Sequence, residues 1–290
     1  MKTSLTIGVY FILTVSARQM VAQPYIDIAG ARYVKSPDAG IVNHNGNKTI
    51  LTYYNIGGNV PLPLNHKKDF LILSPCFENW QANLYNGDIP GGKETYIGLV
   101  FPVSWLKQLH NPLWSIQSTV IIRMNDRTID NHGQWQVGGA ILVAWKKSPV
   151  ITWKAGLYVN GEYFGLFVVP LLGFDWKINP GTRLFGVLPG SATLEKKISP
   201  HFYGGGTYRS ATNSFAKETR DVYWRINENQ LGLYLDYYCN KNIVLTAEAG
   251  HSLFRRIRIT QYANSGIEKI NLHPNDNVYF KVGAAYRIRL

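Results

Sequence analysis

Apolar and polar residues alternate along most of this chain with a period of two. The C-terminal segment NVYFKVGAAYRIRL shows the pattern plainly, with Val278, Phe280 and Val282 in one phase and Tyr279 and Lys281 in the other. Alternation of this kind predicts β-strands that have one apolar face and one polar face.

The same pattern recurs in many segments, and no segment shows the period of about 3.6 residues that marks an amphipathic helix. We therefore predict an all-β chain. Further alternating runs are TYIGLVFPV, LWSIQSTVIIRMN, QWQVGGAILVAW, ITWKAGLYV, YFGLFVVPLLGFDWK, QLGLYLDYYC and NIVLTAEAG.

Turns are predicted where Asn, Gly and Pro cluster between these runs. Longer polar stretches at 36–48, 125–133, 211–220 and 261–277 are expected to be loops. Since no linker or low-complexity segment interrupts the chain, a single domain is expected. The short turns are expected at Asn86-Gly87, Lys146–Pro149, Asn160-Gly161, Asn179–Gly181 and Asn240–Asn242.

Alternation alone does not say which face meets water. In a soluble β-sandwich the apolar face packs in a core, whereas in a membrane barrel it meets lipid and the polar face lines the lumen. Five tryptophans in the apolar phase lie near strand ends, which favours the barrel, because aromatic girdles mark both membrane interfaces. Trp135 and Trp145 bracket one run, at a spacing that suits a tilted membrane strand. The tryptophans are Trp114, Trp135, Trp145, Trp153 and Trp176.

We predict a single transmembrane antiparallel β-barrel of about 12 strands, within a range of about 10 to 14. Bacterial barrels alternate short periplasmic turns with long outer loops, and the last hairpins of this chain fit that rule. Upstream the alternation fails, because Asn160-Gly161 and Lys147–Pro149 are both tight although they are expected on opposite sides. The segment Pro24–Lys35 would add a thirteenth strand.

The N-terminus predicts export from the cytoplasm. Lys2 precedes the uncharged apolar stretch Leu5–Ala17, and small residues follow it, which is typical of a secretory signal peptide. A membrane-spanning helix would need about 20 apolar residues. We expect a signal peptide over residues 1–22, cleaved after Ala17 or Ala22, and a barrel domain over residues 23–290.

Composition agrees with a membrane barrel. Charged residues make up 17% of the chain, below the roughly 25% of soluble domains, which suits a molecule whose outer surface is not all in water. Cys76 and Cys239 would reach an oxidising compartment, but alternation places them on opposite faces of the sheet, so no disulfide is expected.

Three segments are similar to those of a known family. The start PYIDIAGARYV, the central WKAGLYVNGEYFGLFVVPLLGFDWKINPGTRLFGVLPGS and the following HFYGGGTYRSATNSF resemble a family of outer-membrane β-barrels of unassigned function from the Bacteroidota. The resemblance covers most of the mature chain and is most specific in the central block. It implies a barrel fold and an outer-membrane location, and it implies no catalytic residue or substrate.

The sequence predicts no enzyme site. An outer-membrane lipid enzyme would need a Ser nucleophile beside a His base, and His251-Ser252 is the adjacent pair. Neighbours on one strand point to opposite faces, so these two side chains cannot act together. Since GxSxG, HExxH and Walker motifs are absent, we expect no cofactor and no metal, and a non-enzymatic protein. The alternatives are an outer-membrane lipid-modifying enzyme and an exported soluble β-sandwich that carries lipid.

Charge is more informative than catalytic motifs. Nine charged side chains are expected to point away from lipid into the lumen. A lumen rich in Arg and Lys would favour anionic solutes. Alternatively, internal salt bridges of Arg with Glu248 or Asp175 would plug a narrow barrel. The expected lumen-lining residues are Arg123, Lys154, Asp175, Lys177, Glu248, Arg256, Lys281, Arg287 and Arg289.

The run Phe254–Arg258 breaks the alternation at Arg255. We expect Arg255 on the lipid side where its strand leaves the bilayer, close to lipopolysaccharide phosphates. The formal charge of +12 is scattered through the strands rather than gathered in one patch, so nucleic acid is not an expected partner.

The sequence therefore predicts a barrel of the cell outer membrane of a Gram-negative bacterium, serving as a passive channel for small solutes or as a structural membrane protein. Its expected partners are outer-membrane lipid and lipopolysaccharide, together with the barrel-assembly machinery during insertion.

Overall fold

The computed structural model describes residues 24–42, 44–64, 69–85, 92–126, 135–217, 221–263 and 266–290, and these ranges form strands and connecting turns without a helix. The strands are β1 (Tyr25–Ile41), β2 (His44–Gly57), β3 (Val60–Leu64), β4 (Asp69–Leu73), β5 (Cys76–Tyr85), β6 (Gly92–Gln108), β7 (Trp114–Asp126), β8 (Trp135–Lys146), β9 (Ile151–Glu162), β10 (Gly165–Asn179), β11 (Thr182–Leu188), β12 (Ser191–Lys197), β13 (Phe202–Ala216), β14 (Tyr223–Tyr238), β15 (Ile243–Ala263), β16 (Gly266–Leu272) and β17 (Val278–Arg289).

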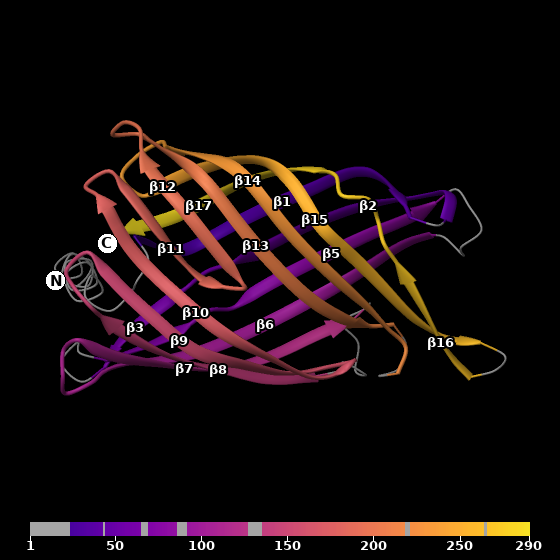
Figure 1. Ribbon diagram of the computed structural model, residues 1–290, viewed down its shortest axis with the longest axis horizontal. Helices are drawn as coiled ribbons and strands as arrows, with labels where there is room; N and C mark the ends of the chain where they lie inside the picture. Colours follow the sequence, from indigo (N-terminus) through magenta and orange to yellow (C-terminus); the bar gives the residue numbers. More distant parts are fainter. Residues whose placement is uncertain are drawn as a thin grey trace, which may run out of the picture.

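The strands close into a ring. Each pairs antiparallel with its neighbours, and β1 pairs both with β2 and with β17, which joins the two ends of the sheet (Figure 1). Three barrel strands are interrupted, because β2 continues into β3, β4 into β5, and β16 into β17, while each pair keeps its partners. The result is a closed antiparallel barrel of 14 strands.

The expectation of about 12 strands is therefore wrong. Of the segment Pro24–Lys35, residues 25–35 belong to β1, which closes the barrel. The short hairpin of β11 and β12 turns at Pro189-Gly190. Its strands contain no long alternating run, so they could not be predicted from the sequence pattern. Polar stretches expected as loops also prolong strands, and β16 lies within the stretch 261–277.

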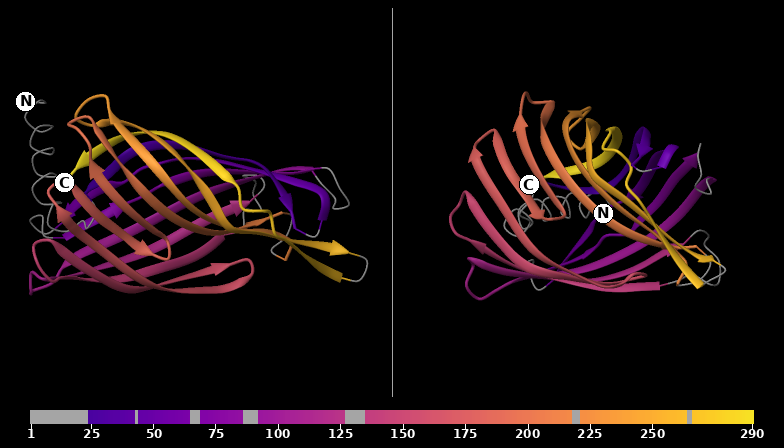
Figure 2. Two further views of the ribbon diagram at one scale, coloured as in Figure 1. Left: turned by 45° about the horizontal axis from the view of Figure 1, so that its top comes forward. Right: turned by 45° about the vertical axis from the view of Figure 1, so that its right-hand side comes forward.

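The start of β1 and the end of β17 lie together at one end of the barrel, where the Leu290 backbone N–H donates to the Pro24 carbonyl over 2.8 Å (Figure 2). We call this the terminal end. The turns at 109–113, 147–150, 180–181, 198–201 and 239–242 lie at this terminal end. The tight turn between β9 and β10 falls at Tyr163-Phe164, and Asn160 and Gly161 belong to β9. That turn and the turn at 147–150 therefore lie at opposite ends, which removes the conflict in the sequence-based alternation.

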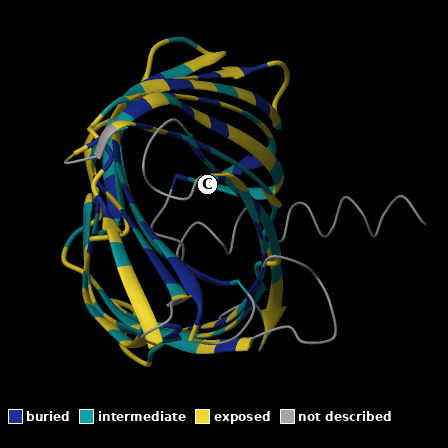
Figure 3. Cartoon of the chain, turned by 90° about the vertical axis from the view of Figure 1, so that its right-hand side faces the viewer, coloured by how far each residue is buried: buried dark blue, intermediate teal, exposed yellow. Residues whose placement is uncertain are grey.

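The apolar face of the sheet points outward. On β14 the residues Leu231, Leu233 and Leu235 are 54%, 73% and 43% exposed, whereas Gly232 and Tyr234 between them are buried. Buried and exposed residues alternate in this way around the ring (Figure 3). The prediction that the apolar face points outward and the polar face points inward is confirmed. The alternative β-sandwich is contradicted, because the apolar rows do not pack against each other.

Tryptophans lie in rows on the outer face. Trp114 pairs with Trp145, and Trp145 pairs with Trp153, across β7, β8 and β9 near the terminal end. Trp135 lies at the opposite end of β8. A strand rises about 3.3 Å per residue and tilts by about 45°, so Trp135 and Trp145 are separated by ~23 Å along the barrel axis, close to the ~25 Å height of an outer-membrane apolar band.

The far end of the interior holds an apolar core. Phe215 at the end of β13 is fully buried and packs on Tyr96 and Trp80, with ring centroids 5.2 Å and 6.1 Å away. Here β13 contacts β6 and β7 across the interior. This far-end core consists of Ile41, Leu51, Trp80, Ala82, Leu84, Tyr96, Phe215, Trp224, Ile226, Ile257, Ile259 and Leu272.

The structure also bears on the cysteines, on membrane-spanning helices and on metal sites. Both cysteines are free. In the described ranges no helix is long and apolar enough to cross a membrane, and no group of acidic, His and Cys side chains could hold a metal ion. The predicted signal peptide and the turn at Asn86-Gly87 lie outside the described residues.

Candidate functional site in the barrel interior

Seven of the nine predicted lumen residues lie on the inner face. Lys177 is exposed close to the turn at 180–181, and Arg256 is exposed on the outer surface. The seven inner residues are Arg123, Lys154, Asp175, Glu248, Lys281, Arg287 and Arg289.

The placement of Arg255 and Arg256 is opposite to the expectation. Phe254 has a φ of 52°, and the pairing of β14 with β15 shifts register at this point, which marks a β-bulge. The extra residue reverses the alternation of β15. Arg255 is consequently buried, where it donates to Glu228 over 2.5 Å and 2.7 Å and to Ser36 over 2.7 Å, while Arg256 lies outside.

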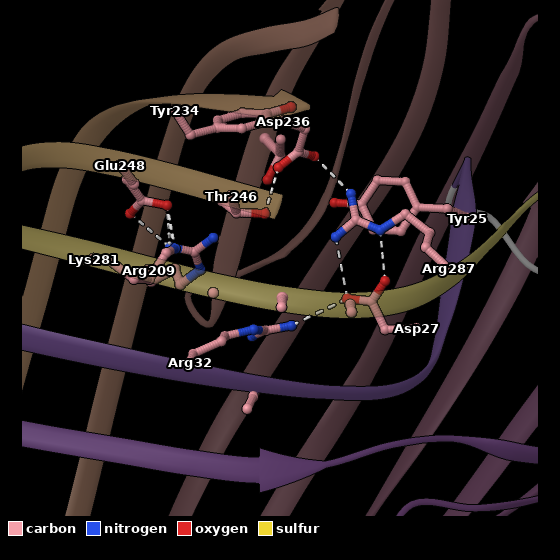
Figure 4. Close-up of a pocket in the computed structure, with 15 residues that line it drawn as sticks. Tyr25, Asp27, Arg32, Arg209, Tyr234, Asp236, Thr246, Glu248, Lys281 and Arg287 are labelled. Atoms are coloured by element: carbon pink, nitrogen blue, oxygen red, sulfur yellow. Dashed lines mark hydrogen bonds and ion pairs between the residues drawn. The ribbon is translucent and has the colours of Figure 1, made fainter. Parts of the chain in front are cut away.

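Glu248 is the centre of one interior ion cluster. Arg209 donates to its two carboxylate oxygens over 2.7 Å and 3.0 Å, Lys281 forms a second ion pair with it, and the Tyr279 hydroxyl donates to it over 2.7 Å. Figure 4 shows Arg209 of β13 beside Glu248 of β15 and Lys281 of β17, so the cluster joins β13 to the paired strands β15 and β17 across β14.

Arg287 is the centre of a second cluster. Its guanidinium pairs with Asp27 over 2.5 Å and with Asp236 over 2.6 Å, and it stacks 3.7 Å from the Tyr25 ring (Figure 4). Asp27 also accepts from Arg32 over 3.3 Å. The alternative of internal salt bridges therefore describes much of the interior, since the acids in both clusters are paired with cations.

In three interior ion pairs the cation is the more exposed member, whereas in the pair of Arg287 with Asp27 the side chains are 6% and 14% exposed. The side chain of Arg32 is 48% exposed against 14% for Asp27, and that of Arg209 is 36% exposed against none for Glu248. Arg123 is 14% exposed and its partner Glu162 is fully buried. A solute inside the barrel therefore meets guanidinium groups, with the compensating carboxylates behind them in the wall.

Two of these cations lie where the interior cavities meet. A cavity of about 420 Å³ and another of about 340 Å³ share Arg32 and Arg209 in their lining, and a small space of about 50 Å³ between the two ion clusters shares them as well. Volumes of this size are in the range of small-molecule sites. The structure thus places two exposed guanidinium groups at the junction of the interior space.

Among the described residues, the pair His251-Ser252, which the sequence offered as base and nucleophile, does not form a catalytic contact. His251 is exposed on the outer face, whereas Ser252 is buried and donates its hydroxyl to the carbonyl of Asn277 over 2.8 Å. The prediction that this pair points to opposite faces is confirmed.

Arg32, Arg209 and Arg255 were not predicted as lumen residues. Arg32 and Arg209 sit in the segments GARYV and GTYRS, whose alternation is blurred by Gly and Ala, so their phase could not be assigned. The odd spacing of Arg255 signalled a break in alternation, but a local pattern does not show whether a bulge reverses the phase.

No protein-family model and no curated protein sequence matches the chain. Among solved structures, it is similar to the COG4313 outer membrane channel from Pseudomonas putida F1, with 12% identity, a TM-score of 0.47, and coverage of 93% of this chain and 98% of that one. It is also similar to the TodX monoaromatic hydrocarbon channel, with 8% identity, a TM-score of 0.40, and coverage of 91% and 90%. The NanC porin matches with 7% identity, a TM-score of 0.35, and coverage of 90% and 100%. These values are too low to assign a family or a function to the chain.

Proposed function

We propose that this protein is a non-enzymatic outer-membrane β-barrel of a Gram-negative bacterium that acts as a passive channel for small anionic solutes. The closed ring, the exposed apolar rows and the tryptophans at both borders support a membrane location, since only a closed barrel or a helix satisfies its backbone in lipid. The terminal end, with its turns of two to five residues, then faces the periplasm.

The family of outer-membrane barrels from the Bacteroidota that the sequence resembles, the domain of unknown function 6268, is proposed as its family. We propose that Arg256, which is exposed on the outer face of β15 in place of the expected Arg255, meets lipopolysaccharide phosphates.

One observation carries the anion preference. Arg32 and Arg209 are the exposed members of their ion pairs and line all three interior spaces. Side-chain cations that line a lumen attract anions and repel cations, because the potential near the guanidinium is positive even when its partner lies behind it.

The test is the reversal potential of the purified, refolded protein in planar bilayers under a KCl gradient. We expect chloride selectivity, which falls when Arg32→Gln and Arg209→Gln are combined. Both changes leave Asp27 and Glu248 paired, with Arg287 and Lys281 respectively.

Arg256→Gln is the matched control, because it removes the same charge from the outer surface. Its selectivity should equal that of the unchanged protein. The proposal would be eliminated by a folded barrel that never conducts. It would also be eliminated if the double variant Arg32→Gln and Arg209→Gln had the same ion selectivity as the unchanged protein.

A further inference from the structure

The barrel wall has a gap in its hydrogen bonding on one side. The pairing of β10 with β11 begins only at Leu172, and the pairing of β13 with β12 ends at Arg209. No described strand pairs with the facing edges of 165–171 on β10 and 211–216 on β13. We call the space between these two edges the lateral window.

The lateral window has a defined border. Its lower border is the tip of the β11–β12 hairpin, where Gly190 accepts from the backbone of Ser210 over 2.8 Å. At its upper border the β9–β10 turn bonds to β13, since the Tyr163 backbone N–H donates to the Ser214 hydroxyl over 3.2 Å. Figure 1 shows the short hairpin between the longer β10 and β13. The window is thus bounded above and below by bonded structure.

The 420 Å³ cavity reaches this window. Phe167, Val169 and Leu171 of β10 line it from one edge, and the hairpin tip lines it from below. Residues of both phases of β13 line it from the other edge, namely Ser210, Ala211, Thr212 and Asn213. Because neighbouring strand residues point to opposite faces, the cavity extends around the β13 edge toward the outer surface.

Free strand edges in a membrane have a physical consequence. Backbone N–H and C=O groups without partners are not tolerated against lipid hydrocarbon, and they occur at membrane depth only beside protein or a water-filled space. On the β13 edge Asn125 donates to the Ser214 carbonyl over 3.0 Å. The other groups of the window edges need water or a polar ligand group beside them. The far-end core packs across the interior above the cavity, and the window offers a route out on that side.

The outer surface changes character across the window. On the β10 side, Leu166 and Val168 are exposed and apolar. On the β13 side, Thr212 accepts from Asn227 over 2.8 Å, and Asn227 accepts from Arg225 over 3.1 Å, so the surface is polar. This change places the window at the border between the apolar band and the headgroup region.

The cavity behind the window has the same two-sided chemistry. Along the cavity, Phe167, Val169 and Leu171 give β10 an apolar inner face, whereas Arg32, Arg123 and Arg209 line the cavity from β1, β7 and β13, together with Glu78 of β5. An apolar wall opposite guanidinium groups suits a molecule with a hydrocarbon part and one acidic group.

We infer that the lateral window is a passage between the barrel interior and the outer leaflet, and that its solute is a small amphipathic carboxylate. The inference rests on the proposed channel function and specifies its solute and its route. The hydrocarbon part slides along β10 while the carboxylate moves to Arg123 and then to the junction at Arg32 and Arg209, from which the 340 Å³ cavity leads on among residues near the terminal end.

The first test uses a photoreactive probe, a diazirine-bearing octanoate, with the full protein in lipid vesicles. Irradiation followed by mass spectrometry should place the label on residues 165–171 and 211–213, and excess octanoate should compete it away while octanol does not. Labelling confined to other segments would overturn the route, and equal competition by octanol would overturn the carboxylate requirement.

The second test narrows the window. Ala211→Trp puts a large ring on one edge, and Val169→Trp does so on the other, so the reasoning does not depend on one variant folding. Ala247→Trp is the control, because Ala247 is exposed on the outer face of β15 away from the cavity. Folding of each variant is checked by the faster gel migration of the unboiled barrel.

Octanoate entry into vesicles should fall about tenfold in either window variant and stay unchanged in the control, a fold-change equal to about 1.4 kcal/mol. Unchanged octanoate entry in a folded window variant would overturn the inference. The proposed function fails separately, since it requires chloride selectivity in bilayers and its dependence on Arg32 and Arg209, neither of which the window tests measure.

Discussion

The bulge at Phe254 makes a prediction that two neighbouring arginines test directly. Arg255 is buried with Glu228, while Arg256, the next residue, is exposed. Simple alternation expects the reverse. Arg255→Met and Arg256→Met remove the same charge at adjacent positions, so any difference in their free energies of unfolding reports which arginine points inward.

The magnitude follows from the contacts of Arg255. Two charge-assisted hydrogen bonds to Glu228 and one to Ser36 are lost, and Glu228 keeps the hydrogen bond from the Gln230 amide at 3.2 Å. An ion pair about 4 Å between charge centres is worth about 4 kcal/mol at an effective dielectric constant near 20. Removing one partner of a buried pair typically costs about 3–5 kcal/mol, because the other charge stays buried without compensation.

We expect Arg255→Met to lower the free energy of unfolding by about 3–5 kcal/mol. Arg256→Met should change it by less than about 0.5 kcal/mol. The double variant Arg255→Met with Glu228→Leu should recover most of the loss, because no buried charge is left over.

The assay is urea unfolding of the folded barrel in lipid vesicles, followed by tryptophan fluorescence and by the mobility of the unboiled protein. An Arg256→Met loss equal to or larger than that of Arg255→Met would refute the placement of the bulge. If the double variant loses as much free energy of unfolding as the two single variants added together, the ion-pair explanation is refuted.

Two further predictions use the same unfolding assay. Phe215→Ala should cost about 3–5 kcal/mol, because a fully buried ring in the far-end core leaves a cavity, and a loss below about 1 kcal/mol would contradict the packing of β13 across the interior. Leu233→Arg should cost about 2–4 kcal/mol in vesicles, because Leu233 is 73% exposed in the middle of the outer apolar row, whereas Asn227→Arg on the polar surface above that row should be nearly neutral. Equal effects of the two arginines would argue against a lipid-facing row on β14.

Much of the fold could be predicted because alternation is a local property. The direction of each side chain follows from its parity along the strand, so the outward apolar rows on β7 to β10, β14 and β17 were evident from residues alone. The tryptophans indicated that the apolar face meets lipid, since a dry protein core would not place Trp114, Trp145 and Trp153 at one end of adjacent strands. Parity also placed Glu248, Lys281 and Arg287 on the inner face.

Only the tertiary structure decided what depends on pairing between distant segments. Strand number required the short hairpin of β11 and β12, whose limits are set by its neighbours rather than by its own pattern. The reversal at Phe254 and the partner of Arg209 across β13 and β15 likewise have no local signal. The lateral window is the clearest case. An unpaired edge exists only where a neighbouring strand ends, and the sequence of one strand does not determine the length of the strand beside it.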